Sequence, residues 1–277
     1  MGMTTELLIP FAPTEVNRWS IARVVVASEA EQPLLARLAA FGPAHYPAGA
    51  GRAIVTLADQ REGLLDLLER EGSVEVVAHE DYDASWRLPA EPVSLAGGLE
   101  VVAAAPAVSP GAKRIVLHPG LAFGDCRHPT TRLCVEAIAE RARERPLRSL
   151  LDVGSGSGVL ALAAYRLGAS RVVATDIDPY ARFVTEENAR RNGVALEVTH
   201  PIPEGARFDV VVASVWASAF PSLAPSLERA LAGDGVLVVS GFPATESASI
   251  AALFPDLRCT PAVMEGWGAL VARRQNT

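Results

Sequence analysis

Glycine occupies every second position in a short loop that follows an apolar run and precedes a predicted helix. The run 149–153 leads into Gly154-Ser155-Gly156-Ser157-Gly158. Residues this small let backbone N–H groups approach a polar ligand closely at the start of a helix. Asp176 ends the next predicted strand, where a carboxylate can accept hydrogen bonds from both hydroxyls of a ribose. Together the two features predict a pocket for a nucleoside cofactor.

The glycine spacing and the neighbouring Asp152 narrow the choice of cofactor. Nicotinamide-binding folds favour G-x-G-x-x-G, whose third glycine would stand at Val159, whereas this chain places it at Gly158. The carboxylate of Asp152 beside the glycine turn would repel a pyrophosphate, but it suits a ligand that carries an ammonium group. S-adenosylmethionine has an ammonium group, a ribose and no phosphate. We therefore expect S-adenosylmethionine as the cofactor, in preference to a loop whose glycines serve only to make the turn.

Composition and charge restrict the class of protein. The chain has 277 residues, of which 49% are hydrophobic and 21% charged, as in an ordinary globular protein. A net charge of −7 argues against binding of nucleic acid through its phosphate groups, so we expect no direct nucleic-acid partner. The cysteines form no CxxC pair and the histidines no metal-ligand spacing, which favours a reducing compartment and no metal site. Neither a signal peptide nor a bilayer-spanning run is present, so we expect a cytoplasmic protein without a membrane partner.

Turn residues and apolar periodicity divide the chain into a small domain over 1–80, a linker over 81–117 and a larger domain over 118–277. The first eighty residues predict strands at 21–27, 44–48, 52–57 and 74–78, with helices at 29–41 and between Asp59 and Gly72. This βαββαβ order is typical of the ferredoxin-like motif. Because the domain holds no chemical motif, we expect it to recognise a substrate. The linker carries short predicted strands near 100–104 and 114–117.

From Pro129 onward, predicted helices and strands alternate. The pattern predicts an α/β fold with a doubly wound, mostly parallel, Rossmann-like sheet. Ligands of such sheets bind at the carboxyl ends of the central strands. Gly154, Asp176 and Ser214 all follow strands that we expect in the centre of the sheet, and so the ligand site should lie there.

A longer segment resembles the signature of a known family. Pro119-Gly120-Leu121-Ala122-Phe123-Gly124, followed by His128-Pro129-Thr130-Thr131, is similar to the P-G-L-A-F-G-T-G-x-H-P-T-T of ribosomal protein L11 methyltransferases. The resemblance continues through the glycine loop, Asp176-Ile177-Asp178-Pro179 and Glu265-Gly266-Trp267-Gly268. It implies an S-adenosylmethionine-dependent class I methyltransferase that acts on lysine or α-amino nitrogen of a protein by direct SN2 transfer. Ribosomal protein L11, another protein or a small amine would then be the acceptor.

The resemblance also implies roles for single residues. In that family the loop before H-P-T-T folds over the cofactor, the glycine loop holds its methionine part, and the acidic residue after the second strand holds its ribose. The implied cofactor-binding residues are Phe123, Gly124, Asp152, Gly154, Ser155, Gly156, Asp176, Ile177 and Ser214. The candidate catalytic residues are Ser214 and His128.

Two segments depart from the family pattern. The family's T-G-x is Asp125-Cys126-Arg127 here, and its V-A-N-I-L-A is Val212-Ala213-Ser214-Val215-Trp216-Ala217. An asparagine amide could bond both cofactor and incoming amine, whereas the hydroxyl of Ser214 is shorter and reaches less far. The expected fold and cofactor are unaffected, but an acceptor other than a ribosomal protein becomes credible.

Several residues admit a structural role as well as a chemical one. His128 could accept a proton from the acceptor, but we favour a helix cap, since methyl transfer needs only a neutral amine. Cys126 is a packed loop residue rather than a nucleophile, because no third group orients it against His128. We expect Trp216 to form an aromatic wall of the site and Trp267 to lie in the core.

Three alternatives to a protein methyltransferase stay open. The first is a small-molecule or peptide methyltransferase on the same scaffold. The second is a nicotinamide-dependent oxidoreductase, which the glycine spacing disfavours. The third is a catalytically silent cofactor-binding module, which Ser214 and Asp125 motivate.

Overall fold

The computed structural model describes residues 4–11, 19–38, 44–45, 52–55, 63–78, 81, 91–103 and 113–275. The chain divides into two compact units. The smaller unit comprises Met1–Ala84 with the short segments Gly120–Ala122 and Asp178–Tyr180. The larger unit comprises Ser85–Pro119, Phe123–Ile177 and Ala181–Thr277. Each unit has its own buried apolar cluster.

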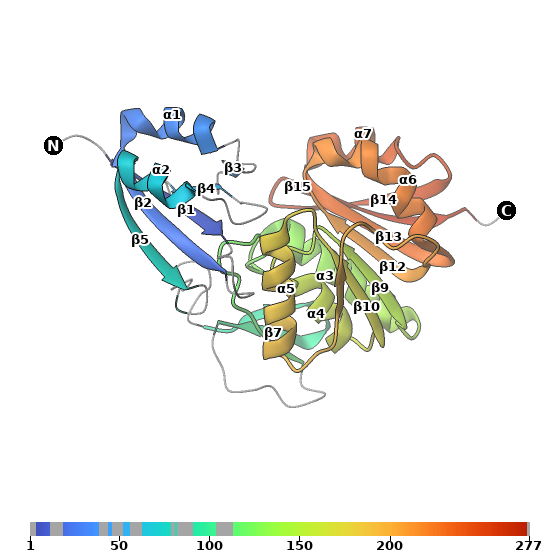
Figure 1. Ribbon diagram of the computed structural model, residues 1–277. Coiled ribbons are helices and arrows are strands. Elements are labelled where there is room, and N and C mark those ends of the chain that lie inside the picture. The colour runs from blue at the N-terminus through green and yellow to red at the C-terminus, as the bar shows by residue number, and fades with distance from the viewer. Residues whose placement is uncertain are drawn as a thin grey trace. The chain divides into compact units, whose positions relative to one another are not determined.

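The smaller unit is a five-stranded sheet with two helices (Figure 1). Its elements are β1 (Thr4–Phe11), β2 (Ser20–Ala27), α1 (Ser28–Leu38), β3 (Ala44–His45), β4 (Arg52–Val55), α2 (Leu64–Glu71) and β5 (Ser73–Ala78). Leucines at helical spacing on α1 and α2, among them Leu34, Leu38 and Leu68, are fully buried against the sheet residues Leu7, Ile9 and Val24.

The sheet of the smaller unit differs from the four-stranded ferredoxin-like arrangement that the sequence predicts. The predicted order of elements is present from β2 to β5, but β1 precedes it. The strand order is β3-β4-β1-β2-β5, so β1 lies between β2 and β4. It pairs antiparallel with β2 and parallel with β4. The sequence predicts no element before residue 21, because the apolar run Leu7-Leu8-Ile9 in β1 is too short to show a period and Pro10 follows it at once.

The larger unit is built on a seven-stranded sheet of order β11-β10-β9-β12-β13-β15-β14. Its strands are β9 (Ser149–Val153), β10 (Arg171–Thr175), β11 (Glu197–Thr199), β12 (Phe208–Ser214), β13 (Leu231–Pro243), β14 (Leu257–Met264) and β15 (Trp267–Arg274). The helices are α3 (Pro129–Glu144), α4 (Val159–Arg166), α5 (Pro179–Arg191), α6 (Phe220–Ala230) and α7 (Ser247–Ala251), with short 3-10 turns η3 (Ala217–Ala219) and η4 (Ala244–Glu246). The neighbours from β11 to β13 are parallel, and only the pairs of β15 are antiparallel. The predicted doubly wound, mostly parallel sheet is therefore confirmed.

Both faces of this sheet are buried, which explains the uninterrupted apolar strands. Alternate residues of β12 face opposite sides, so Val210 and Val212 join the core under α3 and α4, whereas Val211 joins the core under α6 and α7 (Figure 1). The central strands thus hold their carboxyl ends at one rigid edge.

A small sheet precedes the larger one. It has the order β6-β7-β8, formed by β6 (Val93–Leu95), β7 (Leu99–Val102) and β8 (Arg114–Val116), with the turn η2 (Ala96–Gly98) between the first two. Its apolar side chains Leu99, Val101 and Ile115 belong to the same buried cluster as α3 and α4. The described part of the predicted linker is therefore packed into the larger unit. In the part of the chain that the structure describes, no helix is long and apolar enough to cross a membrane.

Candidate cofactor site

The glycine loop is fixed at the ends of two neighbouring strands. The N–H groups of Gly154 and Ser155 donate to the carbonyl of Thr175, at 2.8 and 3.1 Å. The N–H of Gly156 donates to Oδ2 of Asp176 at 3.0 Å. The loop after β9 and the acidic residue after β10 are thus joined directly, as the sequence predicts for one ligand site.

The loop needs glycine because of its backbone and its close neighbours. Gly154, Gly156 and Gly158 have φ values of 78°, 53° and 81°, in the left-handed region. A Cβ on Gly156 would stand 2.4 Å from the carbonyl oxygen of Phe123. The loop therefore accepts no side chain at this position without displacing the segment above it.

The segment that contains Phe123 and Gly124 is held against the glycine loop. The N–H of Ser157 donates to the carbonyl of Phe123 at 2.8 Å, and its Oγ donates to the carbonyl of Gly124 at 2.6 Å. Ser155 is anchored separately, since its Oγ lies 2.9 Å from Oγ1 of Thr185 on α5. The Phe123 side chain is 51% exposed although its backbone is fixed. Its ring is therefore available to cover a ligand.

Asp152 is a buried carboxylate with one uncommitted oxygen. Its Oδ2 accepts the N–H of Ala161 at 3.1 Å, while its buried Oδ1 has no hydrogen-bond partner among the described residues. Burial is the main cause that raises the pKa of Asp152 to about 7, with a further contribution from the nearby charge of Asp176. A cationic ligand group would satisfy this oxygen and favour its ionised form. The residue therefore fits the ammonium group of S-adenosylmethionine.

Asp176 and Ile177 follow β10 at the same edge. One oxygen of Asp176 accepts the loop N–H, and a carboxylate oxygen has room for further donors such as ribose hydroxyls. The guanidinium of Arg182 donates to the carbonyls of Asp176 and Ile177, at 2.7 and 3.1 Å. The Ile177 side chain is 82% exposed. The backbone is thus held rigidly while the apolar side chain lies open to a ligand.

His128 caps α3, in agreement with the structural role that the sequence favours. His128 directly precedes Pro129, the first residue of α3. Its Nδ1 accepts the backbone N–H of Thr130 at 3.4 Å and lies 2.7 Å from Oγ1 of the same residue. Its ring packs edge-on against Phe123 and Trp267, with centroid separations of 5.4 and 4.6 Å. Desolvation lowers the pKa of His128 below its usual value. The imidazole therefore braces the segment in its neutral form at neutral pH.

The segment that departs from the family pattern has a clear local structure. Oδ1 of Asp125 accepts the N–H of Arg127 at 3.1 Å, an Asx turn, and the two side chains form an ion pair at the same distance. Cys126 has φ 67° although it is not glycine, and its side chain is fully buried. The turn thus keeps the backbone conformation that glycine would adopt most easily. Burial raises the pKa of the Cys126 thiol to about 12, which excludes a thiolate nucleophile at neutral pH.

Ser214 ends β12 beside the glycine loop. A Cβ on Gly154 would lie 3.3 Å from the carbonyl oxygen of Ser214, so the two strand ends are close. Beneath them lies Cys134, which is fully buried. Burial raises the pKa of its thiol, while hydrogen bonds with the hydroxyls of Ser240 and Ser214 oppose this shift. Ser214 is itself half-buried, and Trp216 is 64% exposed just beyond it. An exposed indole at this place is suited to contact a substrate.

Two asparagines that sequence reasoning did not single out position the loop before α3. The buried amide of Asn188 bonds both the N–H and the carbonyl of His118, at 2.8 and 3.0 Å, and the carbonyl of Ser157 at 2.9 Å. Asn192 bonds Val116 in the same way, at 2.9 and 2.7 Å. The two asparagines are four residues apart, in the last turn of α5 and directly after it, and therefore share one face of the helix, and this spacing is the signal that could have identified them.

One residue was predicted wrongly. Trp267 is only partly buried, and its ring lies against His128 rather than in the core. The alternating pattern around Trp267 predicts that it lies in a strand. It does not reveal that Trp267 is the first residue of that strand, where its ring can reach His128. Among the described residues no group of three His, Cys, Asp or Glu side chains is arranged to hold a metal.

Comparison with protein families and curated proteins agrees with this site. The family model described as "Ribosomal protein L11 methyltransferase (PrmA)" matches residues 23–275. The chain is 37% identical to the ribosomal protein L11 methyltransferase of Vibrio parahaemolyticus over 209 residues, which cover 73% of this chain and 70% of that one. It is 41% identical to the enzyme of the same name from Geobacter sulfurreducens over 212 residues, which cover 73% and 69%.

Solved structures show the same fold. The ribosomal protein L11 methylase of Lactobacillus delbrueckii has a TM-score of 0.59 and 33% identity, with 67% of this chain and all of that chain covered. A 16S rRNA N2 G1207 methyltransferase of T. thermophilus, with a TM-score of 0.52 and 20% identity, shares the fold over 67% of this chain and 50% of its own. The glycine loop, Asp152 and Asp176 fit S-adenosylmethionine, which is the cofactor of this fold. The chain therefore belongs to the ribosomal protein L11 methyltransferase family, and it is an S-adenosylmethionine-dependent methyltransferase.

Proposed function

We propose that this enzyme methylates amino groups of a ribosomal protein, on lysine side chains or the α-amino group, with ribosomal protein L11 as the first candidate. The observation that carries the proposal is the extent of the family match, over residues 23–275. The match includes most of the N-terminal segment, where no cofactor-binding residue lies, as well as the cofactor site. A substrate shared with the named relatives would explain why both parts are similar.

The residues of the site have separate roles in this proposal. When bound, S-adenosylmethionine supplies a methyl group on a sulfonium, which a neutral amine accepts by in-line displacement. Asp152 would hold the ammonium group, Asp176 the ribose, and the glycine loop the methionine part. Phe123 and Ile177, both exposed, would exclude water from the bound ligand.

On the acceptor side we assign Ser214, Trp216 and His128. We propose that the hydroxyl of Ser214 meets the incoming nitrogen and that Trp216 forms a wall of its pocket. His128 is a positioning residue, because its Nδ1 is engaged in capping α3. We further propose that residues 1–80 recognise the substrate, that 81–117 connect the parts, and that 118–277 carry the methyltransferase. The cysteines of the chain form no disulfide, which supports a cytoplasmic site of action.

The test uses purified L11, the full chain and isotope-labelled S-adenosylmethionine. Mass spectrometry of L11 should count one or more added methyl groups, located on lysine or the N-terminus. A lysate from cells without this enzyme and a metabolite extract serve as competing acceptors. If L11 stays unmodified while another fraction is labelled, the acceptor is wrong; if nothing is labelled, the chain binds the cofactor without turnover.

A further inference from the structure

Helix α5 places polar side chains, rather than only apolar ones, against the loops of the cofactor site. Thr185 and Asn188 on this helix are both fully buried. They are three residues apart, so they share one face of the helix. A buried polar group costs free energy unless it is hydrogen-bonded, whereas an apolar side chain could fill the same space without that requirement. The polarity of this face is therefore explained by the bonds that it makes.

The Thr185 hydroxyl bonds two residues of the glycine loop. Its Oγ1 donates to the carbonyl of Gly156 at 3.1 Å and lies 2.9 Å from Oγ of Ser155. A hydroxyl carries a single proton, and a carbonyl can only accept. Because the Thr185 proton is committed to Gly156, the Ser155 hydroxyl must donate to Thr185. The N–H of Ser155 already donates to the carbonyl of Thr175, so Ser155 offers the cofactor acceptor atoms only.

The methyl group of Thr185 lies beside the far end of the same loop. A Cβ on Gly158 would stand 3.1 Å from Cγ2 of Thr185. The N–H of Gly158 in turn donates to the carbonyl of Ser155 at 2.7 Å, which closes the loop on itself. Thr185 therefore supports both ends of the loop from below. Since its side chain is fully buried, it does so without reaching the ligand.

Gly156 connects Thr185 to the acidic residue of the site. Its carbonyl accepts the Thr185 hydroxyl, and its N–H donates to Oδ2 of Asp176 at 3.0 Å. Because both of its main-chain groups are bonded, Gly156 cannot rotate without breaking one of these bonds. A continuous series of hydrogen bonds thus runs from Ser155 through Thr185 and Gly156 to the Asp176 carboxylate.

We propose that Thr185 is a positioning residue for the cofactor. Its hydroxyl holds the glycine loop and, through Gly156, the Asp176 carboxylate in the arrangement that binds S-adenosylmethionine. Groups that are already in place do not have to be ordered when the ligand binds, so the hydroxyl contributes to affinity without a contact. Every methyl acceptor would share this cofactor site, so the role of Thr185 goes beyond the proposed function and does not depend on L11 as the substrate.

The test measures cofactor affinity in variants of the full chain that keep or lose this hydroxyl. S-adenosylhomocysteine, which has the ammonium group and ribose of the cofactor, is titrated by calorimetry. Thr185→Val keeps the shape of the side chain without the hydroxyl and should weaken binding by about tenfold, the scale of one hydrogen bond. Thr185→Ser keeps the hydroxyl and should stay within about twofold of the unchanged chain. Thr260→Val makes the same substitution at an exposed position on β14 and should leave affinity unchanged.

Urea unfolding of each variant without ligand separates positioning from stability. Calorimetry is carried out under conditions where every variant is folded, so that the affinity is that of the folded chain. The proposal is overturned if Thr185→Val lowers the free energy of unfolding but binds with full affinity, because the residue would then be structural only. It is equally overturned if Thr185→Ser loses as much affinity as Thr185→Val.

Ser155→Ala is a milder change that tests the same hydrogen bonds, including the case in which Thr185→Val does not fold. It removes the donor to Thr185 but leaves the bond from Thr185 to Gly156, so binding should weaken by about threefold. Both changes together should weaken binding no more than Thr185→Val alone, because the two hydroxyls act through one bond. Unchanged affinity in Ser155→Ala, or losses that multiply in the double variant, would overturn the proposal.

Discussion

Asp152 combines a cost in stability with a use in binding. Burial raises its pKa to about 7, from a usual value of about 3.9. Between about pH 4 and pH 7 the folded chain therefore holds a proton that the unfolded chain has lost. The contribution to stability is fully present below about pH 4 and is lost as the pH rises through about 7. At higher pH the folded protein must keep an ionised carboxylate in a dry site.

Asp152→Asn should separate these two effects. Asparagine keeps the shape without ionising, so the substitution should raise the free energy of unfolding increasingly from pH 5 to pH 8. The gain is about 4 kcal/mol at most, since each pKa unit corresponds to about 1.4 kcal/mol. Cofactor affinity should fall by about tenfold or more, because the ammonium loses a charged partner. Urea unfolding across this pH range and calorimetry measure the two quantities, with the exposed Asp256→Asn as control. A variant that loses stability or keeps full affinity would refute this account.

His128 allows a cap to be distinguished from a base. His128→Ala should lower the free energy of unfolding by about 1 kcal/mol, because the first turn of α3 loses its cap. His128→Asn should restore most of that loss, since asparagine is a good N-cap. Thermal unfolding and methyl-transfer rates are measured on both variants. If asparagine restores stability but the rate stays low at every pH, the imidazole has a chemical role beyond the cap.

At the scale of elements, the site depends on two loops that contact each other through their backbones. The glycine loop follows β9 and the Phe123 segment precedes α3, and Ser157 bonds the carbonyls of Phe123 and Gly124. Asn188 on α5 bonds both sides of this junction, through His118 and Ser157. The loops therefore position the cofactor residues only as a pair.

Gly156→Ala should break this junction. The residue is in the left-handed region, which costs an L-residue about 1 kcal/mol, and the new Cβ would stand 2.4 Å from the Phe123 oxygen. We expect a loss of about 1–3 kcal/mol in stability and at least tenfold weaker cofactor binding. Gly233→Ala is the matched control, because a Cβ there meets nothing within 4 Å and its backbone is outside the left-handed region. Equal effects of the two substitutions, by calorimetry and thermal unfolding, would contradict the argument.

At the scale of the whole molecule, the division of labour between the two units can be tested. We predict that a chain without residues 1–80 binds S-adenosylhomocysteine with an affinity within about threefold of the full chain, because the residues of the cofactor site lie elsewhere. It should no longer methylate the protein acceptor. Stabilisation by S-adenosylhomocysteine in thermal unfolding establishes that the shortened chain is folded. Normal methylation by such a folded chain would show that these residues do not recognise the substrate.

The sequence by itself determined the larger sheet, the cofactor and most of the proposed site. Short runs rich in β-branched residues, such as the valines of β12, alternate with helical patterns, and this combination identifies them as strands of a parallel sheet. Asp152 and Gly154 lie at the end of one apolar run, over β9, and Asp176 directly follows the next, over β10. The parallel topology then brings strand ends to one edge without further information.

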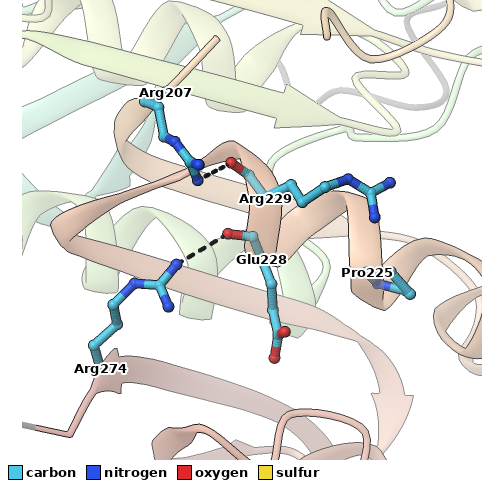
Figure 2. A pocket seen from close by; sticks show the side chains of 5 residues that line it. All are labelled: Arg207, Pro225, Glu228, Arg229 and Arg274. Carbon is cyan, nitrogen blue, oxygen red and sulfur yellow. Dashed lines mark hydrogen bonds between the residues drawn. The ribbon is translucent and has the colours of Figure 1, made fainter. Parts of the chain in front are cut away.

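Only the tertiary structure decided what depends on contacts between distant segments. The place of β1 beside β4 rests on the pairing of Glu6 with Arg52, which no local pattern reveals. The role of Asn188 depends on His118, seventy residues earlier along the chain. The hollow in Figure 2 likewise brings together Arg207, Arg229 and Arg274, which come from the residue before β12, the end of α6 and the end of β15. Local residue patterns determine elements, whereas burial and partner geometry exist only once the elements are packed together.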